Sequence, residues 1–124
     1  MKDFDIPEYL QPDKETLDES YKSHGFFEMQ IEPLKTFTFL RDWYMEDKYG
    51  IRPDRQGVSK DGDPFLAYKP RKKKKTDIEE VYIETYEGSV VMAVKTHSEV
   101  SVREYFSLAE LCNRIDEIIY NGLL

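Results

Sequence analysis

The run from Ile78 to Phe106 constrains the fold most, because it is rich in β-branched and aromatic residues and only short polar turns interrupt it. Such a pattern is typical of antiparallel strands joined by tight hairpins. The two turns are Glu87-Gly88 and His97-Ser98-Glu99. They predict a meander of three strands, which are Ile78–Tyr86, Ser89–Thr96 and Val100–Phe106.

A two-residue turn at Glu87-Gly88 also predicts the register of the first hairpin. In this register Glu80 lies opposite Lys95, which is a favourable pair of opposite charges. One face of the hairpin then holds apolar side chains and one threonine, and a slip by one residue would mix them with charged ones. The predicted core face consists of Val81, Ile83, Thr85, Val90, Met92 and Val94.

A three-residue second turn would place Val102 beside Val94, Phe106 beside Val90 and Glu104 opposite Met92. The other face of the sheet then gathers tyrosine and charged side chains. Because tyrosine and arginine are enriched at protein interfaces, this face is our candidate partner-binding surface. Alternatively, a second layer from the N-terminal half covers this face of the sheet, or the face is simply solvated. The candidate residues are Tyr82, Glu84, Tyr86, Lys95, Arg103 and Tyr105.

A C-terminal helix is predicted over residues 107–122. Ser107 and Glu110 have the spacing of a capping box, and Asn121-Gly122 suits a left-handed cap at the other end. Apolar residues recur every three or four positions between them, so one side of the helix should cover the core face of the meander. Cys112 lies on that side, where we expect a buried small hydrophobe rather than a nucleophile. The apolar positions are Leu108, Leu111, Cys112, Ile115, Ile118 and Ile119.

An aromatic-rich helix is predicted over residues 33–49, with Pro33 at its start and Gly50 at its end. We expect it to pack on the edge of the sheet or on the face opposite the C-terminal helix. Residues 34–40 also fit the alternation of a strand, so both structures stay open there. The two apolar rows of the helix are Leu34, Phe37, Leu40 and Tyr44, and Phe39 with Trp43.

The remaining N-terminal segments carry weaker signals. Asp13–Ser23 fits a short helix, and Phe26–Ile31 fits a strand. The segment Asp61-Gly62-Asp63-Pro64 consists of residues that strongly favour a turn, so we predict an irregular hairpin within residues 51–70. Because the 124 residues show no internal repeat and no shift in composition, we predict a single α+β domain over residues 1–124.

A basic segment stands out from an acidic chain. Residues 51–75 carry 9 basic and 3 acidic residues, whereas the whole chain has a net charge of −7. Five like charges in a row repel one another in a regular element, so residues 69–77 are predicted to form an exposed loop. Such a loop binds a nucleic-acid backbone, binds an acidic partner or is simply solvated. The residues concerned are Lys69, Arg71, Lys72, Lys73, Lys74 and Lys75.

The sequence shows no pattern for catalysis or for cofactor binding. One cysteine and two histidines do not give the spacing of a zinc site, and no glycine-rich phosphate loop occurs. Ala93-Val94-Lys95 has alanine where a metal-dependent nuclease of the restriction type needs its second acid. We therefore expect no metal, no cofactor and no enzymatic activity. With no long apolar run and no possible internal disulfide, we also expect no membrane contact and a cytoplasmic location.

The expected function is that of a small acidic interaction protein, an adaptor, inhibitor or regulator, which binds a protein partner. By analogy with small proteins of mobile elements, its acidic surface would stand in for phosphate in the basic site of a nucleic-acid enzyme. The alternative is a nucleic-acid-binding accessory protein that uses the basic run 69–75. An enzyme of unrecognised type is the third alternative, and the oligomeric state stays open.

Overall fold

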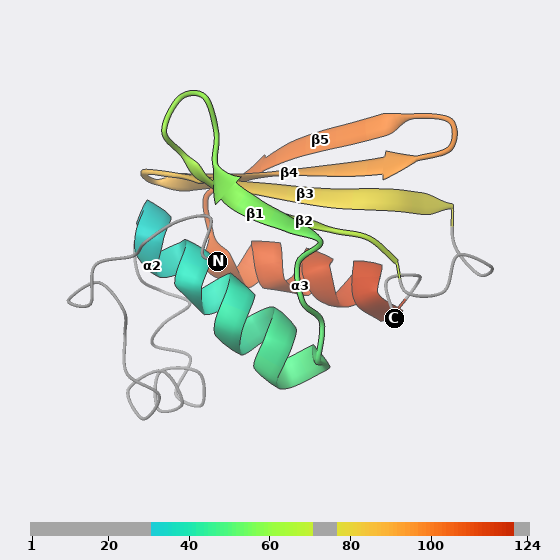
Figure 1. Ribbon diagram of the computed structural model, residues 1–124, viewed down its shortest axis with the longest axis horizontal. Coiled ribbons are helices and arrows are strands. Elements are labelled where there is room, and N and C mark those ends of the chain that lie inside the picture. The colour runs from blue at the N-terminus through green and yellow to red at the C-terminus, as the bar shows by residue number, and fades with distance from the viewer. Residues whose placement is uncertain (1–30, 71–76, 121–124) are drawn as a thin grey trace.

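A five-stranded antiparallel sheet forms one layer of the molecule, and two helical segments form the other (Figure 1). The structure is a computed structural model that describes residues 31–70 and 77–120. The strands lie side by side in chain order, so the sheet is a meander, and the predicted α+β arrangement is confirmed. The elements are α2 (Pro33–Thr38), η3 (Phe39–Lys48), β1 (Arg55–Val58), β2 (Pro64–Tyr68), β3 (Ile78–Tyr86), β4 (Ser89–Thr96), β5 (Val100–Tyr105) and α3 (Leu108–Ile118).

The predicted register of the first hairpin, β3–β4, is confirmed. Tyr86 lies opposite Ser89, and Glu80 lies opposite Lys95. Gly88 adopts a φ of 86°, which an L side chain rarely accepts, so glycine suits this turn. The register therefore places the predicted core face on one side of the sheet, toward the helices.

The predicted register of the second hairpin, β4–β5, is wrong by one residue. Arg103 lies opposite Met92, and Tyr105 lies opposite Val90. The cause is the turn, in which the Thr96 N–H donates to the Glu99 carbonyl at 2.8 Å and the Glu99 N–H donates to the Thr96 hydroxyl at 3.2 Å. Only two residues remain in the loop. The shift moves Arg103 and Tyr105 to the helix side of the sheet.

The C-terminal helix α3 forms as the sequence predicts. The Ser107 hydroxyl accepts a hydrogen bond from the Glu110 N–H at 3.4 Å, which caps the first turn. The predicted cap at Asn121-Gly122 lies outside the described residues. All six predicted apolar positions of this helix are buried, namely Leu108, Leu111, Cys112, Ile115, Ile118 and Ile119.

The aromatic-rich helix begins at Pro33 and ends before Gly50, whose φ is 68°. It starts as the α-helix α2 and continues as the wider π-helix η3, so residues 34–40 are helical rather than extended. The expectation that it packs on the sheet edge or on the other face is wrong, because α2 and α3 cover the same face (Figure 1). The Thr85 hydroxyl, buried on that face, lies 3.1 Å from the carbonyl oxygens of both Pro33 and Pro64, and it donates its single proton to these two acceptors in alternation.

The predicted hairpin within residues 51–70 is present as β1 and β2, with Gln56 opposite Leu66. The predicted helix Asp13–Ser23 lies outside the described residues, as does the predicted strand Phe26–Ile31 except for its last residue. Ile31 itself is buried, and its carbonyl accepts a hydrogen bond from the Gly88 N–H at 2.9 Å.

The position of the core between the sheet and the helices can be tested by replacing valine with alanine at a buried site and at a partly exposed site. Val90→Ala removes two methyl groups from a fully buried side chain of β4. It should lower the free energy of unfolding by about 2 kcal/mol in chemical denaturation. Val58→Ala, on a side chain that is 46% exposed, should cost less than half as much. Equal losses at the two positions would contradict this placement of the core.

Candidate functional site

The sheet has an outer face, turned away from both helices, that no described helix or strand covers (Figure 1). Tyr82, Glu84, Tyr86 and Lys95 lie on it, as the sequence predicts, and Glu104 joins them because of the corrected register. Arg103 and Tyr105 do not lie on it. The outer face consists of Arg55, Phe65, Ala67, Glu80, Tyr82, Glu84, Tyr86, Ser89, Val91, Ala93, Lys95, Val100, Val102 and Glu104.

At the centre of the outer face, two tyrosines hold one carboxylate. Tyr82, Glu84 and Tyr86 are alternate residues of β3, so their side chains stand side by side. The Tyr82 hydroxyl donates to Oε1 of Glu84 and the Tyr86 hydroxyl donates to Oε2, each at 2.5 Å. Glu84 is only 9% exposed. Because both carboxylate oxygens accept a hydrogen bond, the three side chains are fixed relative to one another.

The carboxylate raises the pKa of both phenols. For Tyr86, the hydrogen bond to Glu84, burial and the charges of Glu84 and Asp63 raise the pKa to about 12. For Tyr82, burial is the largest cause and the hydrogen bond to Glu84 the next, and the pKa is raised further. Both phenols therefore stay protonated at neutral pH and act as hydrogen-bond donors.

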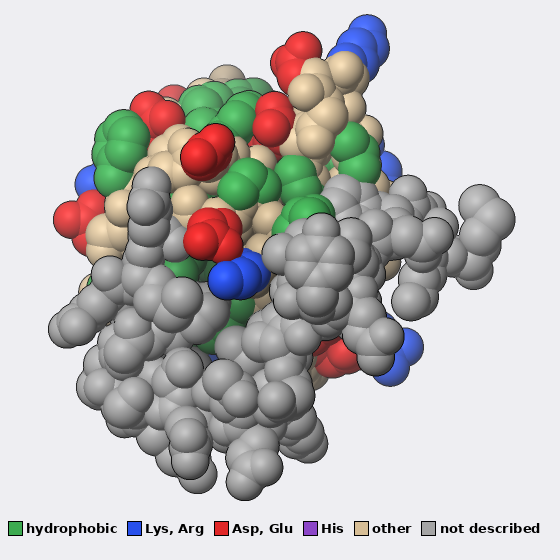
Figure 2. All heavy atoms as spheres, turned by 90° about the vertical axis from the view of Figure 1, so that its left-hand side faces the viewer, with side chains coloured by type: hydrophobic (Ala, Val, Ile, Leu, Met, Phe, Trp, Pro, Cys, Tyr) green, Lys and Arg blue, Asp and Glu red, His purple; other side chains and the backbone are tan. Residues whose placement is uncertain are grey.

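Further acids surround this cluster. Burial, Glu84 and Asp61 raise the pKa of Asp63, so the carboxylates of the β1–β2 and β3 segments repel one another. Glu104 accepts a hydrogen bond from the Ser89 hydroxyl at 2.8 Å. Figure 2 views the end of the molecule with the β1–β2 and β3–β4 turns, where acidic side chains lie among apolar ones. We call the following residues the acidic tyrosine patch: Asp61, Asp63, Tyr82, Glu84, Tyr86 and Glu104.

Positive charge on the outer face lies beside this patch and is partly neutralised. The rings of Phe65 and Tyr82 contact each other with centroids 5.3 Å apart, and the Arg55 guanidinium lies 6.0 Å from the centroid of Phe65. Arg55 also pairs with Glu80 at 3.2 Å. Lys95 is exposed on the next row. The outer face is therefore acidic at one end and mixed in charge at the other.

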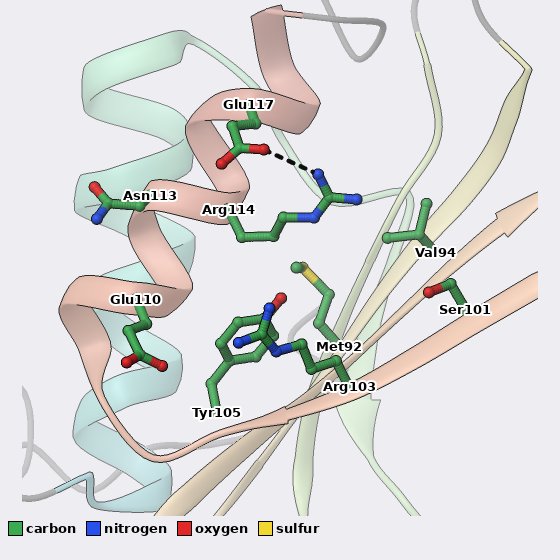
Figure 3. Close-up of a pocket in the computed structure, with 9 residues that line it drawn as sticks. All are labelled: Met92, Val94, Ser101, Arg103, Tyr105, Glu110, Asn113, Arg114 and Glu117. Atoms are coloured by element: carbon green, nitrogen blue, oxygen red, sulfur yellow. Dashed lines mark hydrogen bonds and ion pairs between the residues drawn. The ribbon is translucent and has the colours of Figure 1, made fainter.

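Arg103 and Tyr105, predicted on the partner-binding face, instead line a cleft of about 440 Å³ between β4, β5 and α3 (Figure 3). The Arg103 guanidinium lies 4.9 Å from the centroid of the Tyr105 ring. Across the cleft, Arg114 and Glu117 of α3 form an ion pair at 3.2 Å. Sequence reasoning missed this cleft because it depends on the length of the β4–β5 turn.

Of the predicted basic site, only Lys69 falls on described residues. It is exposed and pairs with Asp54 at 3.5 Å. It also lines a shallow pocket with Glu79, Lys95 and His97, in which His97 Nδ1 lies 2.8 Å from a carboxylate oxygen of Glu79. The other candidates lie outside the described residues, namely Arg71, Lys72, Lys73, Lys74 and Lys75.

A second polar cluster ties the two helices together. Asp116 of α3 accepts hydrogen bonds from the hydroxyls of Tyr44, at 2.6 Å, and Tyr49. Lys48 lies 3.7 Å from the same carboxylate and 4.6 Å from the centroid of the Tyr44 ring. Tyr44 and Tyr49 are five residues apart, and the π-helical winding brings them to one side, which a helical period of 3.6 would not predict.

Cys112 of α3 is a free cysteine and is buried. Burial raises the pKa of Cys112 to about 12, so the thiol stays protonated at neutral pH and is a poor nucleophile. Within residues 31–70 and 77–120, no three side chains of His, Cys, Asp or Glu gather closely enough to hold a metal ion. In the same ranges, no helix has the length and apolar character needed to cross a membrane.

Comparisons with protein-family models, with curated proteins and with solved structures find no match to this chain.

The Tyr86–Glu84 hydrogen bond can be tested by titration. Glu84→Gln removes the negative charge that disfavours the phenolate, so the pKa of Tyr86 should fall from about 12 toward 10 in an NMR titration of its ring carbons. Glu104→Gln removes a nearby acid that does not touch Tyr86 and should leave this pKa unchanged. Because the pKa of Tyr86 is raised on folding, its contribution to stability is complete below pH 10 and is lost as the pH rises toward 12. A pKa near 10 in the unsubstituted protein would contradict the contact.

Proposed function

We propose that this chain is a non-enzymatic interaction protein that binds a basic protein partner through the acidic tyrosine patch. The observation that carries the proposal is the pair of phenols fixed on Glu84, on a sheet face that no described element covers. Tyrosine supplies a large contact area at a low cost in conformational entropy, since it has only two rotatable side-chain bonds. Here that cost is lower still, because the hydrogen bonds fix the rings before binding.

The charge of the patch supports a basic partner. The patch holds four acids, Asp61, Asp63, Glu84 and Glu104. Burial is the largest cause of the raised pKa of Asp63, and repulsion from Glu84 and Asp61 raises this pKa further. An approaching lysine or arginine relieves that repulsion, which favours binding and speeds encounter. We propose that the partner is a protein whose basic site binds nucleic acid, so that the carboxylates take the place of phosphates.

Charge reversal with a matched control tests this proposal. The double variant Asp61→Lys/Glu104→Lys changes two exposed residues of the patch. The control Asp47→Lys/Glu117→Lys changes net charge equally, at exposed positions of η3 and α3. Each protein is used to capture partners from nuclease-treated native lysate, followed by quantitative mass spectrometry. The unsubstituted chain and the control should retain a stoichiometric basic partner that the patch variant loses at least tenfold.

Two results would contradict the proposal. Equal capture by the patch variant and the unsubstituted chain would mean that binding does not use the patch. Loss of the partner in the control as well would mean that net charge, rather than this surface, governs binding.

The basic segment supports a second candidate function, binding to nucleic acid, because Lys69 is exposed where the run begins. In that case the captured partners would disappear on nuclease treatment. Replacing Lys72–Lys75 by serine would abolish binding to a DNA or RNA duplex, and the affinity of the unsubstituted chain would fall steeply with salt. Duplex binding that is insensitive to salt and to these substitutions would contradict this function.

A further inference from the structure

Strand β5 forms one edge of the sheet, and no described strand pairs with its free side (Figure 1). Five of its six residues are exposed. Val100 and Val102 are 58% and 63% exposed, although valine favours burial. An unpaired edge with apolar side chains is a template for pairing with another strand.

The backbone of β5 is ready for such pairing. The Thr96 N–H donates to the Glu99 carbonyl, so Glu99 directs its backbone groups toward β4. Backbone direction alternates along an antiparallel strand, so Ser101 and Arg103 also face β4. Val100 and Val102 therefore direct their N–H and C=O groups away from the sheet.

The opposite edge is less suited to pairing. Strand β1 has only four residues, compared with six in β5. The Gln56 side chain of β1 accepts a hydrogen bond from Arg41 of η3 at 3.1 Å, which ties this edge to the helical layer.

We propose that two copies of this chain pair antiparallel through β5, about a twofold axis at Ser101, to form one continuous ten-stranded sheet. In this register Val100 lies opposite the partner's Val102, and these residues exchange backbone hydrogen bonds. Glu99 lies opposite the partner's Arg103, on the helix side of the sheet. The interface goes beyond the proposed function, because it uses the sheet edge rather than the acidic tyrosine patch.

Charge complementarity selects this register. Within the described ranges, neither Glu99 nor Arg103 forms an ion pair. Opposed residues must share a face of the sheet, so competing registers differ by an even number of residues. A twofold axis at Arg103 would place the two copies of Arg103 opposite each other. A twofold axis at Val102 would place Val100 opposite Glu104 of the other copy. The axis at Ser101 pairs valine with valine and acid with base, twice each, because the contact is self-complementary.

The first test measures the mass of the full chain in solution by sedimentation equilibrium. The experiment covers about 1 µM to about 1 mM, which spans the affinities of small interfaces. We expect a mass of twice 14.7 kDa at the higher concentrations. A monomer throughout this range would overturn the proposal and leave the edge unpaired or open to the strand of a different protein.

A charge swap tests the register. Glu99→Arg and Arg103→Glu each place like charges opposite one another, so each should weaken the dimer roughly tenfold or more. An equimolar mixture of the two variants restores opposite charges at both positions and should form a heterodimer. The double variant Glu99→Arg/Arg103→Glu should dimerise like the unsubstituted chain. Failure of the mixture and of the double variant to dimerise would overturn the register.

A backbone substitution tests the hydrogen bonds. Val102→Pro removes an N–H that faces the free edge rather than β4, so the chain should fold and remain monomeric. Val102→Thr keeps that N–H and the β-branched shape, and should still dimerise. Circular dichroism shows whether each variant is folded. If the proline variant is unfolded, the charge-swap variants test the dimer in its place. A Val102→Pro variant that folds and dimerises normally would overturn the proposal.

Discussion

The pairing of β3 with β4 is the constraint on which the rest of the structure depends. The turn at Glu87-Gly88 leaves Tyr86 opposite Ser89, and every residue of both strands is thereby assigned to one face. The inner face becomes apolar and requires the cover that α2, η3 and α3 supply. The outer face receives Tyr82, Glu84 and Tyr86, so the candidate site follows from the same register as the core.

Much of the fold could be predicted because its signals are local. Gly88 marks the first turn, Ser107 caps α3, and Pro33 opens α2. The second turn could not be predicted in the same way, because the hydrogen bonds between Thr96 and Glu99 decide whether its loop has two residues or three. That single residue determines which face carries each side chain of β5.

The residues of the candidate site also fall into those that local sequence signals predict and those that they do not. Tyr82, Glu84 and Tyr86 lie on one strand, so their common face follows from alternation alone. Arg103 and Tyr105 depend on pairing across the second turn, and the structure places them on the opposite face. The Tyr44–Tyr49–Asp116 cluster depends on π-helical winding and on the packing of two helices, which the sequence pattern does not contain.

If two copies pair through β5, their outer faces join into one surface with two acidic tyrosine patches, and a repetitive basic partner could bind both at once.

Hydroxyl-radical footprinting of the free chain, with all 124 residues present, tests most directly whether the outer face is open. Tyr82 and Tyr86 are partly exposed in the described structure, whereas Tyr68 is fully buried beneath the helices. An open outer face predicts that Tyr82 and Tyr86 are oxidised readily and that Tyr68 is protected. Protection of Tyr82 and Tyr86 to the level of Tyr68 would mean that another part of the chain covers this face, and would contradict its role as a binding surface.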